Sequence, residues 1–170
     1  MEIKQHLVYL SLGSNLGDRL NYLIQVMRLI KQNKCELTKI SSIYETPSWG
    51  YLSSNRYLNC CVEIKTSHSP FELLEVLKNI ELQLGREIKG VYSDRNVDID
   101  ILRYDDISIN ELDLIIPHPH MYQRAFVLIP LLDIIDKRDI KFYKKVENTF
   151  LNIKDKSEII KYSDVEKNSI

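Results

Sequence analysis

The chain has 170 residues, of which 44% are hydrophobic and 28% are charged, and its formal net charge is -1. This length and composition fit one domain, residues 1–170, with a substantial core, and they exclude collagen-like, disordered and disulfide-framework classes. A near-neutral charge gives no overall attraction to nucleic acid or to an anionic membrane. Any anionic ligand must therefore be held by a local cluster of basic residues.

No segment has the pattern of a targeting or membrane-spanning element. The N-terminal apolar run is too short for a signal sequence, and no stretch approaches eighteen apolar residues. Cys35, Cys60 and Cys61 are odd in number and lack a CxxC spacing, so we expect reduced structural thiols. These features predict a cytoplasmic protein with no membrane partner.

The first third of the chain alternates predicted strands with a helix. Residues 6–12 form a β-branched and aromatic run, after which turn and cap residues start a helix that extends to about Asn33. Residues 36–45 and 57–66 are predicted strands. The segment 47–55 between them mixes helix breakers with aromatic residues and predicts a loop.

The second predicted helix has the clearest signals. Ser69, Pro70 and Glu72 supply an N-cap, a proline at the first helical position and a capping-box glutamate. Leucine and isoleucine then recur at helical spacing until Gly85. We therefore expect one buried face along this helix.

The remainder of the chain predicts one further strand and one further helix. Residues 86–96 are polar and aperiodic and predict a mobile loop, whereas residues 97–104 alternate as a strand. A hairpin-like stretch at 107–116 and a helix at 122–132 follow, and the tail beyond about Asp139 is weakly patterned. This order predicts an α+β fold of the ferredoxin-like type: one antiparallel sheet, helices packed on one face, and mobile loops around the site.

Asp98 and Asp100 are the strongest candidates for metal chemistry. Strand alternation places the apolar residues around them on the core face and both carboxylates together on the other face. Carboxylates at this spacing can bridge two Mg²⁺ ions about 3.5–4 Å apart. A solvated strand face explains the same pattern, but the nearby Arg86 and Arg95 favour a Mg-nucleotide site.

The phosphates of such a nucleotide would have to be held by side chains. The five glycines form neither a GxxxxGK[ST] nor a GxGxxG pattern, so Arg86, Arg95, Arg124 and metal must do this. Glu81 either reaches the same face or lies on the helix surface. The sequence around it favours the surface position.

Three residues suggest a clamp for a flat heteroaromatic ligand. Tyr57 and Asn59 share a strand face, and Phe126 comes from the third helical region. Rings supply stacking and an amide reads paired donors and acceptors. Composition alone favours the alternative that Tyr57 and Phe126 are ordinary core aromatics.

Two further features leave alternatives open. His118 and His120 flank a proline and suit either a transition metal or a phosphate hydrogen bond, although two ligands rarely make a metal site. Trp49 is the sole tryptophan and suits either a core anchor or a loop lid.

Six motifs occur in order between about Leu7 and Leu132. They are GSNLGDR, SSIYETP, YLNCCVEI, IELQLGR, DRNVDIDIL and PHPHMYQRAFVLIPL. The DxD that follows an arginine and the PH-x(5)-R-x-F element are jointly specific. Together the motifs resemble the 6-hydroxymethyl-7,8-dihydropterin pyrophosphokinase family of folate biosynthesis.

The resemblance implies a ferredoxin-like fold and transfer of pyrophosphate from MgATP to the hydroxymethyl group of a reduced pterin, releasing AMP. It implies two Mg²⁺ ions and ATP as co-substrate. The near-neutral charge predicts no nucleic-acid partner, and we expect that no oligomeric partner is required. The implied catalytic residues are Arg86, Arg95, Asp98 and Asp100, the two aspartates also binding metal. The implied pterin-binding residues are Thr46, Pro47, Trp49, Tyr57, Asn59 and Phe126. The implied ATP-binding residues are Leu74, Glu81, Arg86, Lys89, Tyr92, Arg95, Ile101, His118 and Arg124.

The chain departs from the family pattern at four positions. Ser48 stands where a second proline is common, which we expect to loosen that loop. Lys89 and Tyr92 stand where the family often has arginine and tryptophan, and Pro119 replaces an aromatic residue. We expect these changes to affect loop closure and rate more than the type of reaction.

Two other classes of protein fit part of the pattern. A ferredoxin-like nucleic-acid-binding module would show aromatic strand motifs and a basic face, and the sequence has neither. A two-metal nuclease would use the same DxD but would not need the Tyr57, Asn59 and Phe126 clamp.

The chemistry of direct transfer requires positioning and charge neutralisation, which two metals and three arginines supply.

Overall fold

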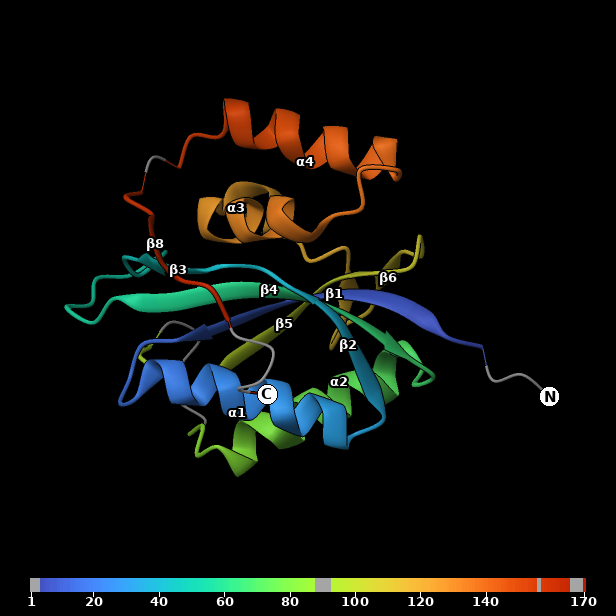
Figure 1. Ribbon diagram of the computed structural model, residues 1–170, viewed down its shortest axis with the longest axis horizontal. Helices are drawn as coiled ribbons and strands as arrows, with labels where there is room; N and C mark the ends of the chain where they lie inside the picture. The colour runs from blue at the N-terminus through green and yellow to red at the C-terminus, as the bar shows by residue number, and fades with distance from the viewer. Residues whose placement is uncertain (1–3, 88–92, 156, 166–169) are drawn as a thin grey trace.

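The computed structural model describes residues 4–87, 93–155, 157–165 and 170. In this part of the chain a six-stranded antiparallel sheet has the strand order β5-β1-β4-β3-β8, and β2 also pairs with β4 (Figure 1). A separate hairpin pairs β6 with β7. The strands are β1 (His6–Ser14), β2 (Cys35–Ile40), β3 (Ile43–Thr46), β4 (Tyr57–Thr66), β5 (Asp98–Tyr104), β6 (Ile109–Asn110), β7 (Ile115–Ile116) and β8 (Ile160–Ser163).

Two helices, α1 (Arg19–Gln32) and α2 (Pro70–Gln83), cover one face of the sheet (Figure 1). Ser69 and Glu72 form the predicted capping box at the start of α2, so its N-terminal N–H groups are satisfied. The buried stripes of both helices pack against alternate residues of β1, β4 and β5. This layer holds the larger of the two apolar clusters.

A second helical layer lies on the opposite face, so the expectation of helices on one face only is wrong. It consists of α3 (Ala125–Ile134), which follows a short 3₁₀ turn at Met121–Gln123, and α4 (Ile140–Asn152). Because α3 is apolar on nearly all sides, it is buried between the sheet and α4. Seven consecutive buried residues in both β1 and β4 reflect the two covered faces.

The predicted strand at 36–45 is two strands, β2 and β3, with a break at Ser41 and Ser42. The hydroxyl of Ser41 accepts a 2.9 Å hydrogen bond from the backbone N–H of Cys61 and donates a 2.7 Å bond to the carbonyl of Ser42. A side chain thus takes the place of a backbone partner in the ladder, which interrupts the strand. The tail forms α4 and the edge strand β8, which pairs with β3.

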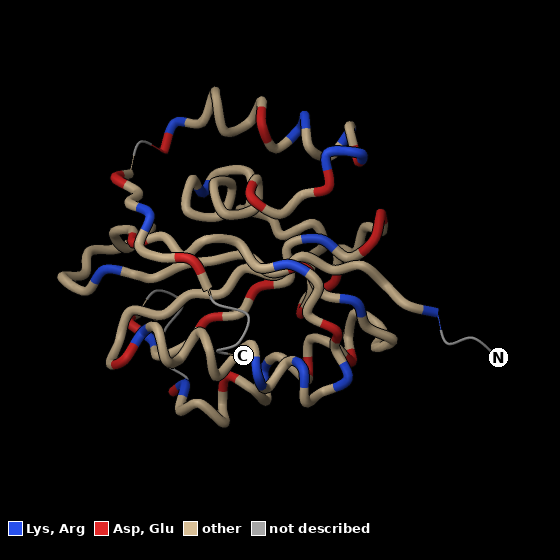
Figure 2. The backbone as a smooth tube through the Cα atoms, viewed as in Figure 1, with Lys and Arg blue, Asp and Glu red and all other residues tan. Residues whose placement is uncertain are grey.

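Lys and Arg are interspersed with Asp and Glu along the helices and loops, in keeping with the near-neutral net charge (Figure 2). None of the helices in the described part of the chain is both long and apolar enough to span a membrane.

Candidate active site

A cavity of about 480 Å³ opens where strand ends, α2 and the segment leading into α3 meet. All predicted site residues that the structure describes line it, except Ile101, which is buried in the core beneath β5. Lys89 and Tyr92 lie outside the described residues. The lining residues are Thr46, Pro47, Trp49, Tyr51, Tyr57, Asn59, Leu74, Lys78, Glu81, Arg86, Arg95, Asp98, Ile99, Asp100, His118, Pro119, His120, Arg124 and Phe126.

Gly13 of the central strand β1 lies between the two halves of this site. It pairs with Asn59 of β4 on one side and with Asp98 of β5 on the other. Directly opposed residues of antiparallel strands point to the same face of a sheet, so both side chains face the cavity. A Cβ at Gly13 would lie 2.8 Å from Oδ1 of Asn59. The absence of a side chain here therefore gives the amide its space.

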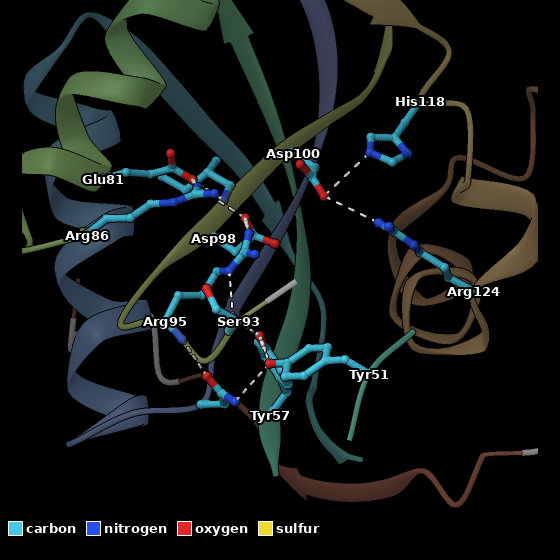
Figure 3. Close-up of polar contacts among 12 residues, drawn as sticks. Tyr51, Tyr57, Glu81, Arg86, Ser93, Arg95, Asp98, Asp100, His118 and Arg124 are labelled. Atoms are coloured by element: carbon cyan, nitrogen blue, oxygen red, sulfur yellow. Dashed lines mark hydrogen bonds and ion pairs between the residues drawn. The ribbon is translucent and has the colours of Figure 1, made fainter. Parts of the chain in front are cut away.

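The carboxylate of Asp98 lies between two guanidinium groups (Figure 3). Its Oδ1 is 3.0 Å from Nη1 of Arg95 and 3.1 Å from Nη1 of Arg86. Arg86 also pairs with Glu81, whose Oε1 accepts a 2.7 Å hydrogen bond from the backbone N–H of Ile99. Glu81 is only 7% exposed, so its expected position on the helix surface is wrong. Burial raises the pKa of Glu81, and Arg86 opposes the shift.

Asp100 has longer contacts than Asp98. Its Oδ2 lies 3.6 Å from Nε2 of His118 and 3.6 Å from Nη1 of Arg124, beyond normal hydrogen-bonding distance (Figure 3). Burial and then the neighbouring Asp98 raise the pKa of Asp100 to about 7, because a desolvated carboxylate beside a second negative charge resists ionisation. A cation between the two carboxylates would oppose both effects.

The ring of His118 presents a donor to the cavity. Its Nδ1 accepts a 3.1 Å hydrogen bond from the backbone N–H of His120, so the proton of the neutral ring lies on Nε2, toward Asp100. Burial and the nearby Arg124 lower the pKa of His118 to about 4. The ring is therefore neutral at pH 7 and suited to donating a hydrogen bond to an anionic oxygen.

Aromatic rings surround the guanidinium group of Arg124. Its Cζ lies 4.6 Å from the ring centroid of Trp49 and 5.7 Å from that of Phe126, within range of cation–π interactions. The ring of His120 lies 5.9 Å from that of Trp49. Trp49 is thus part of the cavity wall and not a core anchor.

A buried hydrogen bond fixes the polar side chains that lie beside the aromatic residues of the cavity. Nδ2 of Asn59 donates a 2.8 Å hydrogen bond to Oγ1 of Thr46, and both side chains are buried. Tyr57 and Phe126 line the same cavity and are half-buried, so they are not ordinary core aromatics.

Sequence reasoning missed three lining residues, Tyr51, Lys78 and Ile99. Lys78 lies four positions after Leu74 and three before Glu81, and this helical spacing is the signal that could have found it. Tyr51 belongs to the aromatic loop after β3. Within that loop the hydroxyl of Ser48 donates a 2.6 Å bond to the carbonyl of Tyr51. Ser48 therefore closes a turn within the loop, and the expectation that it loosens the loop stays a prediction.

The cavity as a whole suits a polyanion beside a flat ring. Its described lining has four cationic side chains, from Lys78, Arg86, Arg95 and Arg124, against three carboxylates. Most of the charged groups gather near β5 and α2, and the aromatic side chains gather near β3, β4 and α3, with Arg124 between Trp49 and Phe126. Such a lining could hold phosphates in one half and a heteroaromatic ring in the other.

Comparisons with known proteins agree with this geometry. The sequence profile of the 7,8-dihydro-6-hydroxymethylpterin-pyrophosphokinase family matches residues 9–136. A 2-amino-4-hydroxy-6-hydroxymethyldihydropteridine pyrophosphokinase of Bacillus subtilis (strain 168) is 48% identical over 130 residues, which cover 76% of this chain and 78% of that protein. The protein of the same name from Aquifex aeolicus (strain VF5) is 38% identical over 149 residues, 84% of this chain and 92% of that protein.

A crystal structure of an HPPK-DHPS in complex with substrates has the same fold as this chain. The TM-score is 0.66 at 15% sequence identity, over 87% of this chain and 43% of that chain. The chain thus spans about two-fifths of the solved protein that it matches.

The family profile and the named relatives make this chain a transferase that acts on a nucleotide. More particularly, the chain belongs to the 7,8-dihydro-6-hydroxymethylpterin-pyrophosphokinase family, which confirms the resemblance drawn from its motifs. It is an ATP-dependent pyrophosphokinase that transfers pyrophosphate to a hydroxymethyldihydropterin in folate synthesis.

Proposed function

We propose that the transfer is one in-line displacement at the β-phosphorus of ATP, with Asp98 and Asp100 holding two Mg²⁺ ions beside the phosphates. The hydroxymethyl oxygen of the pterin forms its bond to the β-phosphorus and releases its proton to solvent, while the bond from that phosphorus to the bridging oxygen of AMP breaks. The observation that carries the proposal is the placement of both carboxylates on one face of β5, beside a cavity lined by three arginines.

The residues at hand fit Mg²⁺. Among the described residues no group of three or more His, Cys, Asp or Glu side chains could hold a metal by itself. Mg²⁺ commonly uses one or two carboxylates and completes its shell with water and substrate phosphates. Bound there, it would neutralise phosphate charge and orient the reacting groups. Asp98 and Asp100 match this requirement, and the lengthened contacts of Asp100 leave its lone pairs available.

The basic side chains would position the phosphates. Arg86 and Arg95 converge on Asp98 from one side, and Arg124 approaches Asp100 from the other. Planar guanidinium groups bind phosphate oxygens in a bidentate manner, which fixes orientation as well as charge. They would bind the ATP phosphates along β5, where the reaction needs in-line geometry.

The aromatic half would bind the pterin. Tyr57 and Phe126 would stack on its ring, while Asn59, with Thr46 and the loop through Pro47 and Trp49, would read its polar edge. The buried hydrogen bond from Asn59 to Thr46 supports this role, because it orients the amide before any ligand binds.

The adenosine and the outer phosphates would lie beside α2, β5 and the segment before α3. Leu74 and Ile99 line the cavity near α2 and β5, and His118 presents its Nε2 proton toward Asp100. We propose that Leu74 contacts the adenine and that His118 donates to a phosphate. The roles of Lys89 and Tyr92 in ATP binding remain predictions from the family resemblance.

A direct transfer agrees with the available nucleophiles. The described lining includes no cysteine or serine, and burial raises the pKa of the Cys60 and Cys61 thiols in the core. The proton on Nε2 of His118 prevents this nitrogen from acting as a phosphate acceptor. His120 also lines the cavity, and the trapping experiment below tests it as an acceptor. We infer that no covalent phosphoenzyme forms.

We propose that the partners of this chain are ATP and the reduced pterin, which the charged and aromatic parts of the cavity could hold side by side. The three free cysteines support a reducing compartment such as the cytoplasm.

The stereochemistry at phosphorus tests this proposal. We expect ATP that is chiral at the β-phosphorus to give a product of inverted configuration, as one in-line step requires. Retention of configuration, or a labelled enzyme trapped with β-labelled ATP in the absence of pterin, would refute direct transfer.

A further inference from the structure

The carboxylate of Asp94 joins three loops outside the group of residues discussed so far. Its Oδ1 accepts hydrogen bonds from Nδ2 of Asn15 at 2.8 Å and from the hydroxyl of Tyr51 at 3.0 Å. Its Oδ2 accepts a 2.6 Å bond from Nδ2 of Asn55. The bonds from Ser53 and from these groups lower the pKa of Asp94 to about 2. Asp94 is therefore fully ionised at pH 7.

Asn15 connects this carboxylate to the backbone at Arg95. Its side chain is 3% exposed, and its Oδ1 accepts a 2.8 Å hydrogen bond from the N–H of Arg95. Its own backbone N–H donates a 3.2 Å bond to the carbonyl of Arg95. The amide of Asn15 thus holds Arg95, the arginine that pairs with Asp98, in a fixed place relative to β1.

Tyr51 connects the same carboxylate to the aromatic half of the site. The hydroxyls of Tyr51 and Tyr57 are 2.8 Å apart, and the Tyr51 hydroxyl donates to Asp94. Since a hydroxyl has one proton, the Tyr57 hydroxyl is the donor in the 2.8 Å contact, which is much shorter than its other contact, 3.5 Å to the carbonyl of Ser93. The tyrosine pair therefore forms a directed chain that ends on the carboxylate.

We propose that Asp94 is a positioning residue that fastens the pterin half of the site to the phosphate half. Through Tyr51 it orients the Tyr57 ring, and through Asn15 it holds the backbone of Arg95. The inference rests on the proposed stacking of the pterin on Tyr57. It adds a specific set of hydrogen bonds that fixes the position of one substrate subsite relative to the other.

The two branches can be separated by substitution. Tyr51→Phe removes the branch to Tyr57 and a 3.4 Å contact from Nδ2 of Asn15, but it leaves the 2.8 Å bond from Asn15 to Asp94 in place. We therefore expect the Kd of the pterin to rise about fivefold while the Kd of a non-hydrolysable ATP analogue stays within twofold. Asp94→Asn removes an acceptor from both branches. For this variant we expect a rise of about tenfold in pterin Kd together with a fall in kcat.

A double-mutant cycle provides the decisive comparison. If Tyr51 acts through Asp94, the Tyr51→Phe/Asp94→Asn variant should bind the pterin no more weakly than Asp94→Asn alone. Strictly additive losses would overturn the proposal, as would an Asp94→Asn variant whose pterin Kd and kcat stay within twofold of wild type.

Asp113→Asn and Tyr162→Phe are the matched controls, because both residues lie away from the cavity. Thermal unfolding of each variant, with the split between kcat and KM, separates positioning from a general loss of structure.

Phe126→Ala separates this inference from the proposed function. If Phe126→Ala weakens pterin binding but the Asp94 and Tyr51 variants do not, only the fastening role fails. If Phe126→Ala also has no effect, the pterin site itself is misplaced.

Discussion

Asn59 and Asp98 point to the same face of the sheet from the two strands that flank Gly13 of β1. One strand thus separates the residue that would read the pterin edge from a residue that would bind metal. The spacing of the strands sets the distance between the two substrate subsites, because Gly13 between them has no side chain. This arrangement makes Gly13 a sensitive position.

Replacing Gly13 by alanine should therefore damage pterin binding. The new Cβ would lie 2.8 Å from Oδ1 of Asn59, so the amide or the strand has to shift. We expect the KM for pterin to rise about tenfold or more, with a smaller change for ATP. The neighbouring Ser14→Ala is the control, because the Ser14 hydroxyl has no hydrogen-bond partner among the described residues. Equal effects of the two substitutions on pterin KM would contradict the account.

Glu81→Ala should destabilise the fold. It removes the acceptor of the buried Ile99 N–H and the partner of Arg86. We expect a loss of about 1–3 kcal/mol in the free energy of unfolding, measured with urea. Glu81→Gln keeps an oxygen acceptor and should lose less. Equal losses in the two variants would mean that the hydrogen bond to Ile99 contributes little.

Phe126→Ala should weaken pterin binding by about 1–3 kcal/mol through the loss of a stacking ring, with little change in ATP binding. Calorimetry with each ligand measures both effects. Phe150→Ala provides a control, because this ring also packs against the apolar cluster that contains the buried residues of α3 but does not line the cavity. A parallel loss for both ligands would instead make Phe126 a general packing residue.

The hydrogen bonds to Asp94 predict a specific acid sensitivity. Its pKa is about 2 in the folded state against an ordinary 3.8, so between these values the unfolded chain binds more protons. The stabilisation is therefore present above about pH 4 and is lost as pH falls toward 2. We expect the stability difference between wild type and Asp94→Asn to narrow from pH 5 to pH 3 in urea titrations. A constant difference over that range would show that Asp94 has an ordinary pKa.

The sequence predicts the parts of the site that follow from local periodicity. Asp98 and Asp100 are recognisable because Ile99 and Ile101 alternate with them on the buried face of β5. The capping box of α2 and the exact span of β4 are local signals of the same kind.

Other features depend on partners far apart in the chain. Glu81 is buried because the N–H of Ile99 lies opposite it, and Asn15 meets Asp94 across 79 positions. No local pattern marks such pairs. The second helical layer does have a local signal in the sequence. The near-continuous apolar runs in β1 and β4 indicate that both faces of the sheet are covered.

The most direct test of the account measures conversion of ATP to AMP, with and without 6-hydroxymethyl-7,8-dihydropterin, over a Mg²⁺ titration. Wild type should form AMP only when the pterin is present. Asp98→Asn and Asp100→Asn should each lose about 100-fold or more of kcat while unfolding at a temperature close to that of wild type, since they remove metal ligands and not core packing. Asp113→Asn should behave like wild type. Pterin-independent AMP formation, or near-wild-type turnover of either site variant at saturating Mg²⁺, would contradict the account.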